Sequence, residues 1–239
     1  PKTKAIVPVH LFGCPVHREV FDVARDFSIA VIEDAAQAIG ATESGAAVGA
    51  LGAIGCFSFF PTKNLGAVGD GGMITTDSSE LASVLRSLRA HGSTGKHHYA
   101  RLGGNFRLDS LQAAFLSAKL PSLGTLNERR RSNAARYDEA FEGLPLRLPE
   151  RHPGHVFHHY VVQTKARDAL MAHLGARGVR SEVYYPYALH KTPLFEASIS
   201  LPNAERASAE ALALPVHPWL RSDEISRVIE GVRSFFVSG

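Results

Sequence analysis

A single lysine, Lys63, stands between an apolar run and a cluster of glycines. The apolar run, residues 54–60, is typical of a buried strand. Four glycines follow the lysine, at Gly66, Gly69, Gly71 and Gly72. Glycine permits backbone conformations and close approaches that a Cβ would block. An amine held among such turns is poorly solvated, and desolvation favours its neutral, nucleophilic form. The pattern indicates a reactive lysine, although an ordinary surface lysine in a glycine-rich loop would have the same local sequence.

Two further polar residues stand where they could serve the same ligand as Lys63. Asp34 follows an apolar run, residues 29–32, and Ser58 precedes the lysine by five residues. A carboxylate holds a heterocyclic nitrogen protonated, whereas a serine hydroxyl and loop amides bind a phosphate. Pyridoxal phosphate carries an aldehyde, which condenses with a lysine amine, together with a ring nitrogen and a phosphate. The three residues therefore predict a pyridoxal-phosphate site, although Asp34 could instead cap a helix and Ser58 could bond to the backbone.

The elements that would position these residues form a βαβ unit. Residues 5–9 are typical of a short buried strand, residues 18–27 carry apolar residues at helical spacing, and residues 29–32 form a second strand. A strand, a helix and a strand within about 30 residues favour a parallel sheet with right-handed crossovers. Ligands of such sheets gather at the carboxyl ends of the strands, where Asp34 and Lys63 fall.

The remainder of the chain predicts further strands, a connecting helix and a smaller domain. Strands are expected at 54–60, 73–76, 160–163 and 179–183, and helices at 77–88, 108–141 (interrupted by Pro121), 167–176, 204–212 and 223–236. We therefore expect an α/β protein with a mostly parallel sheet in a cofactor-binding large domain, residues 1–124. A connector helix and a small α+β domain follow, residues 125–239.

Composition and charge limit the class of protein. Hydrophobic residues make up 45% and charged residues 21% of the 239-residue chain, which is typical of a soluble globular protein. No apolar run approaches the ~18 to 20 residues that span a bilayer. Cys14 and Cys56 lie outside any CxxC pattern, and the one basic run, residues 129–131, fits a solvated helix face. We expect a cytoplasmic protein with neither nucleic acid nor a membrane as its partner.

Two other kinds of site compete for the same signals. The glycines between Gly66 and Gly72 could form a nucleotide loop, but they lack the GxGxxG order and no GK[ST] follows, so a dehydrogenase is not favoured. His155, His158 and His159 have the spacing of metal ligands, but no carboxylate or cysteine pattern lies nearby. We therefore expect solvent-exposed histidines and no metal.

Four motifs, in order along the chain, resemble those of one family. They are VIEDAAQAIGA at residues 31–41, FSFFPTKNLG at 57–66, GDGG at 69–72 and GNFRLDSLQAA at 104–114. From residue 5 to its last predicted helix, the chain resembles the DegT/DnrJ/EryC1/StrS sugar aminotransferases. These are pyridoxal-phosphate enzymes of the aspartate aminotransferase fold, PLP fold type I. Some dehydratases of the family carry histidine in place of the lysine, so Lys63 argues against that branch.

The resemblance implies a role for each residue of the site. Lys63 would bond covalently to the cofactor and then carry a proton between cofactor and substrate. Asp34 would pair with the ring nitrogen, Gln37 would lie near the 3-oxygen of the ring, and Ser58 would bind the cofactor phosphate. Asn105 would reach the cofactor phosphate of the neighbouring subunit, because family members build each site at a dimer interface.

The resemblance also implies the reaction and its substrates. The segment YYPYALH, residues 184–190, resembles a substrate-side segment of the family. Tyr185 and His190 are therefore candidate substrate-binding residues, although they could equally be ordinary residues of the small domain. The implied reaction moves an amino group from glutamate or glutamine to a nucleotide-linked keto-sugar, in a homodimer with shared active sites. The motifs do not specify the sugar, its carbon or its nucleotide.

One departure from the family supports a different function. Family members carry a substantial segment before the point where this chain starts, so the resemblance implies a large domain that is incomplete at its N-terminus. In the family that segment supplies early strands of the sheet and part of the cofactor site. The chain would then be a fragment, a cleaved product or the product of a truncated gene, and the sequence does not choose among these. The alternative function is that of a truncated, cofactor-free homologue with a binding or regulatory role.

Overall fold

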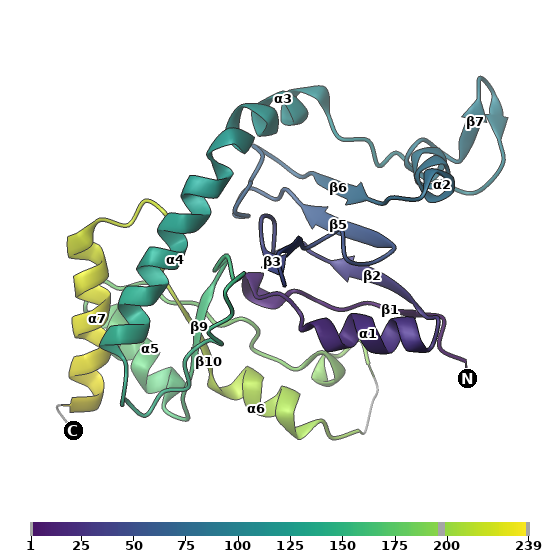
Figure 1. Cartoon of the computed structure of the whole chain (residues 1–239). Coiled ribbons are helices and arrows are strands. Elements are labelled where there is room, and N and C mark those ends of the chain that lie inside the picture. The colour runs from purple at the N-terminus through teal and green to yellow at the C-terminus, as the bar shows by residue number, and fades with distance from the viewer. Residues whose placement is uncertain (1, 196–198, 238–239) are drawn as a thin grey trace. The chain divides into compact units, whose positions relative to one another are not determined.

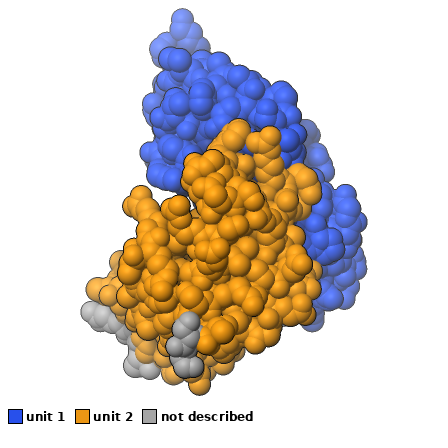
Figure 2. Space-filling model, turned by 90° about the vertical axis from the view of Figure 1, so that its left-hand side faces the viewer, with its two compact units in different colours: residues 1–127, 152–156 blue, residues 128–151, 157–239 orange. Residues whose placement is uncertain are grey.

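The computed structural model describes residues 2–195 and 199–237 (Figure 1). The chain divides into two compact units, coloured separately in Figure 2. Unit 1 comprises residues 1–127 and 152–156, and unit 2 comprises residues 128–151 and 157–239. Unit 1 thus takes in a later segment of the chain, whereas the sequence suggested a single change of domain after residue 124. The extent of the functional domains stays a prediction.

A four-stranded sheet forms the centre of unit 1, in the order β1-β2-β5-β6 (Figure 1). Its strands are β1 (Ala5–Ile6), β2 (Ala30–Asp34), β5 (Ile54–Ser58) and β6 (Gly72–Thr75). β1 and β2 are parallel, as are β2 and β5, so the prediction of a mostly parallel sheet is confirmed. β6 runs antiparallel to β5, because the connection at residues 59–71 consists of turns and bends, and no helix carries the chain back along the sheet.

α1 (Arg18–Asp26) packs against this sheet at β2. Phe21 and Ala24 of the helix form a buried apolar cluster with Val31 of the strand. The predicted burial of the first strand is wrong, because Val7 and Val9, which follow β1, are 59% and 47% exposed. β1 pairs only with β2 in the described chain, so one side of it lacks the cover that a central strand has.

Shorter elements complete unit 1. They are a 3-10 turn (Leu11–Gly13), the hairpins β3 (Thr42–Glu43) with β4 (Ala46–Ala47) and β7 (Ser93–Gly95) with β8 (His98–Tyr99), and the helices α2 (Ser79–Arg89) and α3 (Ser110–Lys119). The Asp109 carboxylate caps α3 by accepting from the Leu111 N–H at 2.8 Å. A 3-10 turn (Leu120–Ser122) then separates α3 from α4 (Leu123–Ala140), which confirms the predicted interruption at Pro121.

Unit 2 is an α+β arrangement around a two-stranded antiparallel sheet. Its elements after α4 are β9 (Tyr160–Gln163), α5 (Arg167–Ala176), a 3-10 turn (Leu189–Lys191), α6 (Pro202–Glu210), β10 (Ala211–Leu214) and α7 (Ser222–Val237). The core includes Tyr137, whose hydroxyl donates to the Pro215 carbonyl at 2.8 Å. The hydroxyl of the buried Tyr160 donates to the Asp138 carboxylate at 2.7 Å, so both buried hydroxyls are satisfied.

Two predictions for unit 2 are wrong. Residues 179–183 form no strand of their own, and only Glu182 pairs, in a bridge with Ala213. Residues 211 and 212, predicted as the end of a helix, begin β10 instead, and all four side chains of β10 are buried. A short apolar run fits a buried strand as well as a buried helix, and here the pairing with β9 decides.

The helices of the described residues lack the combination of length and apolar character that crossing a bilayer requires.

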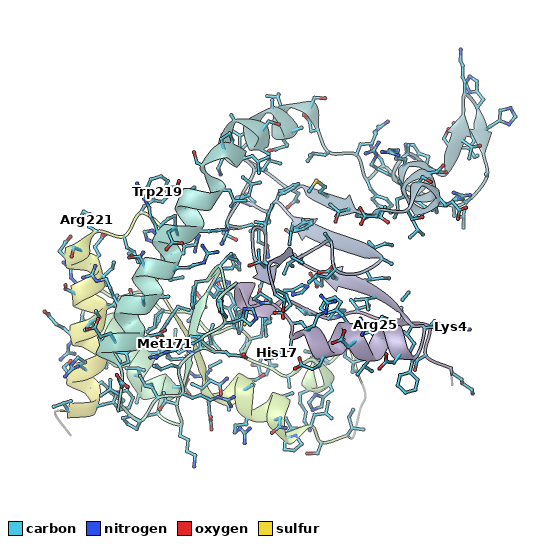
Figure 3. All side chains as sticks on the ribbon, viewed as in Figure 1. Lys4, His17, Arg25, Met171, Trp219 and Arg221 are labelled. Carbon is cyan, nitrogen blue, oxygen red and sulfur yellow. The ribbon has the colours of Figure 1, made fainter. Side chains whose placement is uncertain are left out.

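The arginine run on α4 was expected to be a solvated face, but part of it packs within unit 2. Arg130 is buried and donates to the Phe157 carbonyl at 3.2 Å. The Arg129 guanidinium lies 5.5 Å from the ring centre of Trp219, which is labelled in Figure 3.

Leu170→Ala tests the core of unit 2. Leu170 is 0% exposed, so we expect its truncation to lower the free energy of unfolding by about 2–5 kcal/mol through lost burial and a residual cavity. Leu194 is 82% exposed and serves as the control, since its replacement by alanine should cost less than about 0.5 kcal/mol. Urea denaturation of both variants measures the difference, and equal costs would contradict the packing described here.

Candidate active site

The carboxyl ends of β2 and β5 bring Asp34 and Ser58 to one edge of the sheet. Asp34 is the last residue of β2 and pairs with Cys56, and Ser58 is the last residue of β5. Because the two strands run in the same direction, their carboxyl ends meet at the edge where α/β proteins bind ligands. Lys63 follows on the loop that leaves this edge. Three of the predicted residues are therefore positioned by one end of the sheet.

A turn, and not a helix, fixes the Asp34 carboxylate. Its Oδ1 accepts from the Ala36 N–H at 3.1 Å, and residues 35–41 form turns. The alternative in which Asp34 caps a helix is therefore wrong. The Asp34 backbone is held from both sides, because its N–H donates to the Pro8 carbonyl at 2.9 Å and its carbonyl accepts from the His10 N–H at 3.0 Å.

Backbone hydrogen bonds close the loop that carries Lys63. The Phe59 N–H donates to the Gly71 carbonyl at 2.7 Å, and the Phe59 carbonyl accepts from the Ala67 N–H at 2.8 Å. Lys63 donates its own N–H to the Phe60 carbonyl at 2.9 Å. The two ends of the loop are therefore joined, and the lysine backbone is tied to the strand that precedes it.

A close backbone contact requires glycine at one position of this loop. A Cβ on Gly66 would lie 2.2 Å from the Pro61 carbonyl oxygen. At Gly69 the nearest atom to a Cβ would be the Gln112 Nε2 at 2.7 Å, the end of a flexible side chain that packs over the loop. Gln112 of α3 also accepts from the Val68 N–H at 2.9 Å through its Oε1. The sequence assigned no role to Gln112, although it lies within one of the quoted motifs. The structure shows that it tethers the lysine loop to α3.

The side chain of the residue after the lysine ties the loop to distant segments of unit 1. Asn64 is buried, and its Nδ2 donates to the Asn127 Oδ1 at 2.9 Å and to the Val156 carbonyl at 3.1 Å. Asn127 donates in turn to the Ile39 carbonyl at 3.1 Å, on the segment that follows Asp34. Sequence reasoning missed both asparagines, because the contacts join residues 63 and 92 positions apart and leave no local pattern.

The Lys63 amine is half-buried and stands within electrostatic reach of a carboxylate. Burial lowers the pKa of Lys63 below its ordinary value, and the charge of Asp34 opposes that shift. Burial also raises the pKa of the Cys56 thiol on β5, and the carboxylates of Asp34 and Glu33 raise it further. The lysine therefore holds a larger neutral fraction than a surface lysine does, with a negative charge facing it.

Gln37 and Ser58 are half-buried, and each accepts a hydrogen bond from the backbone. The Gln37 Oε1 accepts from the Phe12 N–H at 2.6 Å, which sets the orientation of its amide. The Ser58 Oγ accepts from the Phe60 N–H at 3.3 Å. A hydroxyl that accepts still has its own proton to donate, so Ser58 can serve an oxygen of a ligand.

Three predicted residues are carried by elements other than β2, β5 and the lysine loop. Asn105 is exposed on the loop that follows β8, where its backbone pairs with Ala90. Tyr185 and His190 belong to unit 2. Tyr185 is 51% exposed, whereas His190 is buried with its Nε2 at 3.0 Å from the Glu205 Oε1. The roles assigned to these three residues stay predictions.

The expectation that His155, His158 and His159 are solvent-exposed is wrong. His155 and His158 are buried, and the half-buried His159 stacks on Tyr184 with ring centres 4.2 Å apart. All three precede β9, His155 as part of unit 1 and His158 and His159 as part of unit 2. Among the described residues, no three histidine, cysteine or acidic side chains are grouped so that they could hold a metal ion.

The edge of the sheet fits a ligand with an aldehyde, a basic ring nitrogen and a phosphate. Lys63 offers a half-buried amine of lowered pKa, and Asp34 offers a fixed carboxylate within its electrostatic reach. Ser58 ends the neighbouring strand beside a loop whose turns require glycine. Pyridoxal phosphate carries the three matching groups. Fold and site thus define a class, the α/β proteins with a lysine at a strand end suited to this cofactor.

Comparison with known proteins identifies the family. The model of the DegT/DnrJ/EryC1/StrS aminotransferase family matches residues 1–233, and the chain belongs to this family. Over 98% of its length the chain is 47% identical to the UDP-N-acetyl-3-dehydro-α-D-glucosamine 3-aminotransferase of Acidithiobacillus ferrooxidans. Over 98% of its length it is 46% identical to the pleiotropic regulatory protein of Geobacillus stearothermophilus. The chain spans 64% and 66% of the lengths of these two relatives.

Solved structures share the fold. The crystal structure of NtdA from Bacillus subtilis with its bound cofactor PMP has a TM-score of 0.90 to this chain at 33% identity. The match covers 99% of this chain and 57% of that protein. The predicted aspartate aminotransferase fold, PLP fold type I, is therefore confirmed.

The titration of Lys63 tests the electrostatics of the site. Because burial lowers its pKa, we expect Lys63 to react with an amine-directed reagent at a lower pH than an ordinary lysine does. In Asp34→Asn the opposing charge is lost, so the labelling curve should move to still lower pH. Peptide-resolved labelling across a pH series measures both curves. The electrostatics would be contradicted by a Lys63 curve that coincides with those of surface lysines, or that moves upward in the variant.

Proposed function

We propose that this protein is a pyridoxal-phosphate-dependent aminotransferase that moves an amino group from glutamate or glutamine to a nucleotide-linked keto-sugar. The observation that carries the proposal is the half-buried amine of Lys63, which has a lowered pKa and faces the Asp34 carboxylate at the carboxyl edge of a parallel sheet. Membership of an aminotransferase family supports it. A relative named as a UDP-sugar 3-aminotransferase supports the substrate class.

The residues at the sheet edge divide the work of such a reaction. Pyridoxal phosphate, when bound, supplies an electron sink for the amino-bearing carbon. Lys63 would hold it covalently, and as a base of lowered pKa would take up and return a proton at Nζ. Asp34 would keep the ring nitrogen protonated, since its carboxylate is fixed and negatively charged. Ser58 would donate to the phosphate, and Gln37 would orient the ring through its 3-oxygen.

The substrate side of the proposal concerns unit 2 and a second subunit. Tyr185 and His190 would contact the substrate, His190 being oriented by the Glu205 carboxylate at 3.0 Å. Asn105, which is exposed, would reach the cofactor phosphate of the other subunit of a homodimer. The substrates are small molecules, and the reaction would take place in the cytoplasm with neither nucleic acid nor a membrane as partner.

A binding or regulatory role is the second candidate function. It is favoured by one observation, the name of the relative from Geobacillus stearothermophilus, which is a pleiotropic regulatory protein. A regulator without catalysis would not need a lysine whose pKa is lowered by burial. The two candidates therefore differ in whether Lys63 binds the cofactor covalently.

Borohydride trapping on Lys63 tests the proposed function. Mixed with pyridoxal phosphate, the purified protein should develop the absorption band of a lysine-bound cofactor, and reduction should leave a phosphopyridoxyl group on the peptide that contains Lys63. Lys63→Ala should abolish the band and the label. Lys96→Ala removes an exposed lysine elsewhere in unit 1 and should change neither. A colourless wild-type protein without a labelled peptide would overturn the proposal and favour the regulatory role.

Mixed dimers test the shared active site. If Asn105 serves the neighbouring subunit, inactive Lys63→Ala and Asn105→Ala proteins should regain activity when they are dissociated and reassociated together. Half of the random dimers are then mixed, each with one intact site of two, so recovery should reach about a quarter of the wild-type activity. Reassociated dimers that stay inactive, with exchange of subunits verified by mass spectrometry, would contradict a shared site.

A further inference from the structure

A second carboxylate, that of Glu33, stands directly before Asp34 and is 0% exposed. Its oxygens accept from three backbone N–H groups, those of Gly49 at 2.7 Å, Leu51 at 2.8 Å and Gly52 at 2.7 Å. The Nε2 of His10, also 0% exposed, lies 3.1 Å from the same carboxylate. Burial alone would raise the pKa of Glu33, but the hydrogen bonds outweigh burial and hold the pKa below its ordinary value. Glu33 is therefore a buried carboxylate ion.

The hydrogen bonds of His10 fix the place of its proton. The Val16 N–H donates to Nδ1 at 3.0 Å, so Nδ1 carries no proton. Nε2 must then carry the proton, and it donates to Glu33. The ring is neutral, and the pair keeps the negative charge of Glu33.

A turn that depends on glycine supplies the backbone donors. Gly49 has a φ of +88°, and a Cβ there would lie 2.2 Å from the Phe57 ring. A Cβ on Gly52 would lie 2.7 Å from the Val31 carbonyl oxygen. The turn therefore approaches the sheet closely enough to present three N–H groups to Glu33, and its geometry matches a carboxylate on this face of β2.

Glu33 and Asp34 point to opposite faces of β2, because successive side chains of a strand alternate. Val31 and Glu33 are buried, whereas Ile32 and Asp34 are half-buried. A shift of the strand by one residue would exchange the two acids between the faces. Because both side chains are carboxylates, their chemistry alone does not decide which of the two faces the candidate site.

His10 forms hydrogen bonds with both Glu33 and Asp34. Its backbone N–H donates to the Asp34 carbonyl at 3.0 Å, and its side chain donates to Glu33. We propose that His10 and Glu33 are positioning residues. His10 and the turn of N–H donors lock the Glu33 carboxylate onto one face of β2. Asp34 is thereby the carboxylate that faces the candidate site, where it is held for a protonated ring nitrogen. Only the ring nitrogen in this statement rests on the proposed function. The selection of Asp34 is a property of the protein without its cofactor.

Unit 1 contains a matched pair that serves as a control. His152 Nε2 lies 2.7 Å from the Glu43 Oε2, and the His152 Nδ1 accepts from the Gly154 N–H at 3.1 Å. This pair therefore has the same proton arrangement and is also largely buried. It lies beside His17, whose ring centre is 6.0 Å from that of His152 and which Figure 3 labels. It holds the end of β3, and in the described part of the chain its hydrogen bonds go to Ser44 and Gly154 and not to β2.

Three substitutions separate the functions of the two pairs. His10→Asn keeps an acceptor for the Val16 N–H but removes the donor to Glu33. His10→Gln places an amide N–H where Nε2 stood and so keeps that donor, while it removes the acceptor of the Val16 N–H. His152→Asn removes the corresponding donor from the control pair. All three are made in the full chain, and the fraction folded is measured by denaturation before each comparison.

The reactivity of Cys56 reports the position of Asp34 without the cofactor. Cys56 pairs with Asp34 across the strands, and after burial the Asp34 charge is the largest cause of its raised pKa. In His10→Asn the hydrogen bond that helps to lock Glu33 is lost, and we expect that Asp34 is then no longer held on the face of the candidate site. Peptide-resolved alkylation of Cys56 should therefore begin at a lower pH, as in Asp34→Asn. His10→Gln and His152→Asn should keep the wild-type profile. The affinity for pyridoxal phosphate should fall roughly tenfold in His10→Asn only.

The outcomes separate this inference from the proposed function. A wild-type protein that fails to bind pyridoxal phosphate overturns the proposed function, while the Cys56 profile still decides whether His10 positions Asp34. A folded His10→Asn protein with the wild-type Cys56 profile and cofactor affinity overturns the inference and leaves the proposed function standing. If His10→Asn does not fold, His10→Gln decides. A folded His10→Gln protein that keeps the donor to Glu33 but loses the wild-type Cys56 profile contradicts the role given to the Nε2 proton. If His152→Asn changes the Cys56 profile and the cofactor affinity as much as His10→Asn does, the His10–Glu33 pair contributes only to general stability, and the inference is overturned.

Discussion

The parallel register of β2 and β5, with Asp34 opposite Cys56, is the constraint on which the candidate site depends. It places the carboxyl ends of two strands at one edge of the sheet. The pairing of the strands, and not a contact between side chains, therefore brings the Asp34 carboxylate close to the start of the lysine loop. It also decides which side chains face the core, because a register shift of one residue would move every side chain of β2 to the other face. The chemistry of unit 1 therefore depends first on backbone hydrogen bonds, and only then on the side chains that could react.

Two ionisable side chains of this unit, the buried Glu33 and the half-buried Lys63, respond to burial in opposite ways. The Glu33 carboxylate has four donors, three of them from the backbone, and its pKa falls despite burial. An unpaired buried carboxylate would cost several kcal/mol, and these donors offset that cost. Among the residues that the structure describes, none donates to or accepts from the Lys63 amine, so burial lowers its pKa and favours the neutral form. The Glu33 carboxylate, whose hydrogen bonds are satisfied, holds β2 in place. The Lys63 amine, which is poorly solvated, keeps the reactivity that a nucleophile needs.

The sequence predicted those features that have local causes. Asp34 could be found because it ends an apolar strand, and Lys63 because it stands between an apolar run and a cluster of glycines. The bounds of β9 and α5 follow from their own periodicity. The direction of β6 and the strand β10 could not be predicted, since both depend on which segment pairs with which. The importance of Glu33 was hidden for the same reason. Nothing near it in the sequence shows that a turn of glycines and a histidine 23 positions earlier would surround it with donors.

The same distinction explains why the lysine is held in place from far along the chain. The glycines that give the loop its tight turns also leave it with more conformational freedom to lose on folding. Local hydrogen bonds join its ends, but the residue beside the lysine is fixed by Asn127 and Val156, which lie 63 and 92 positions later in the chain. Because Val156 belongs to unit 1, a segment from beyond α4 contributes to the surroundings of Lys63. The half-buried environment that lowers the Lys63 pKa can therefore exist only when these distant segments are folded, so the reactive amine depends on the completed unit and not on the loop that carries it.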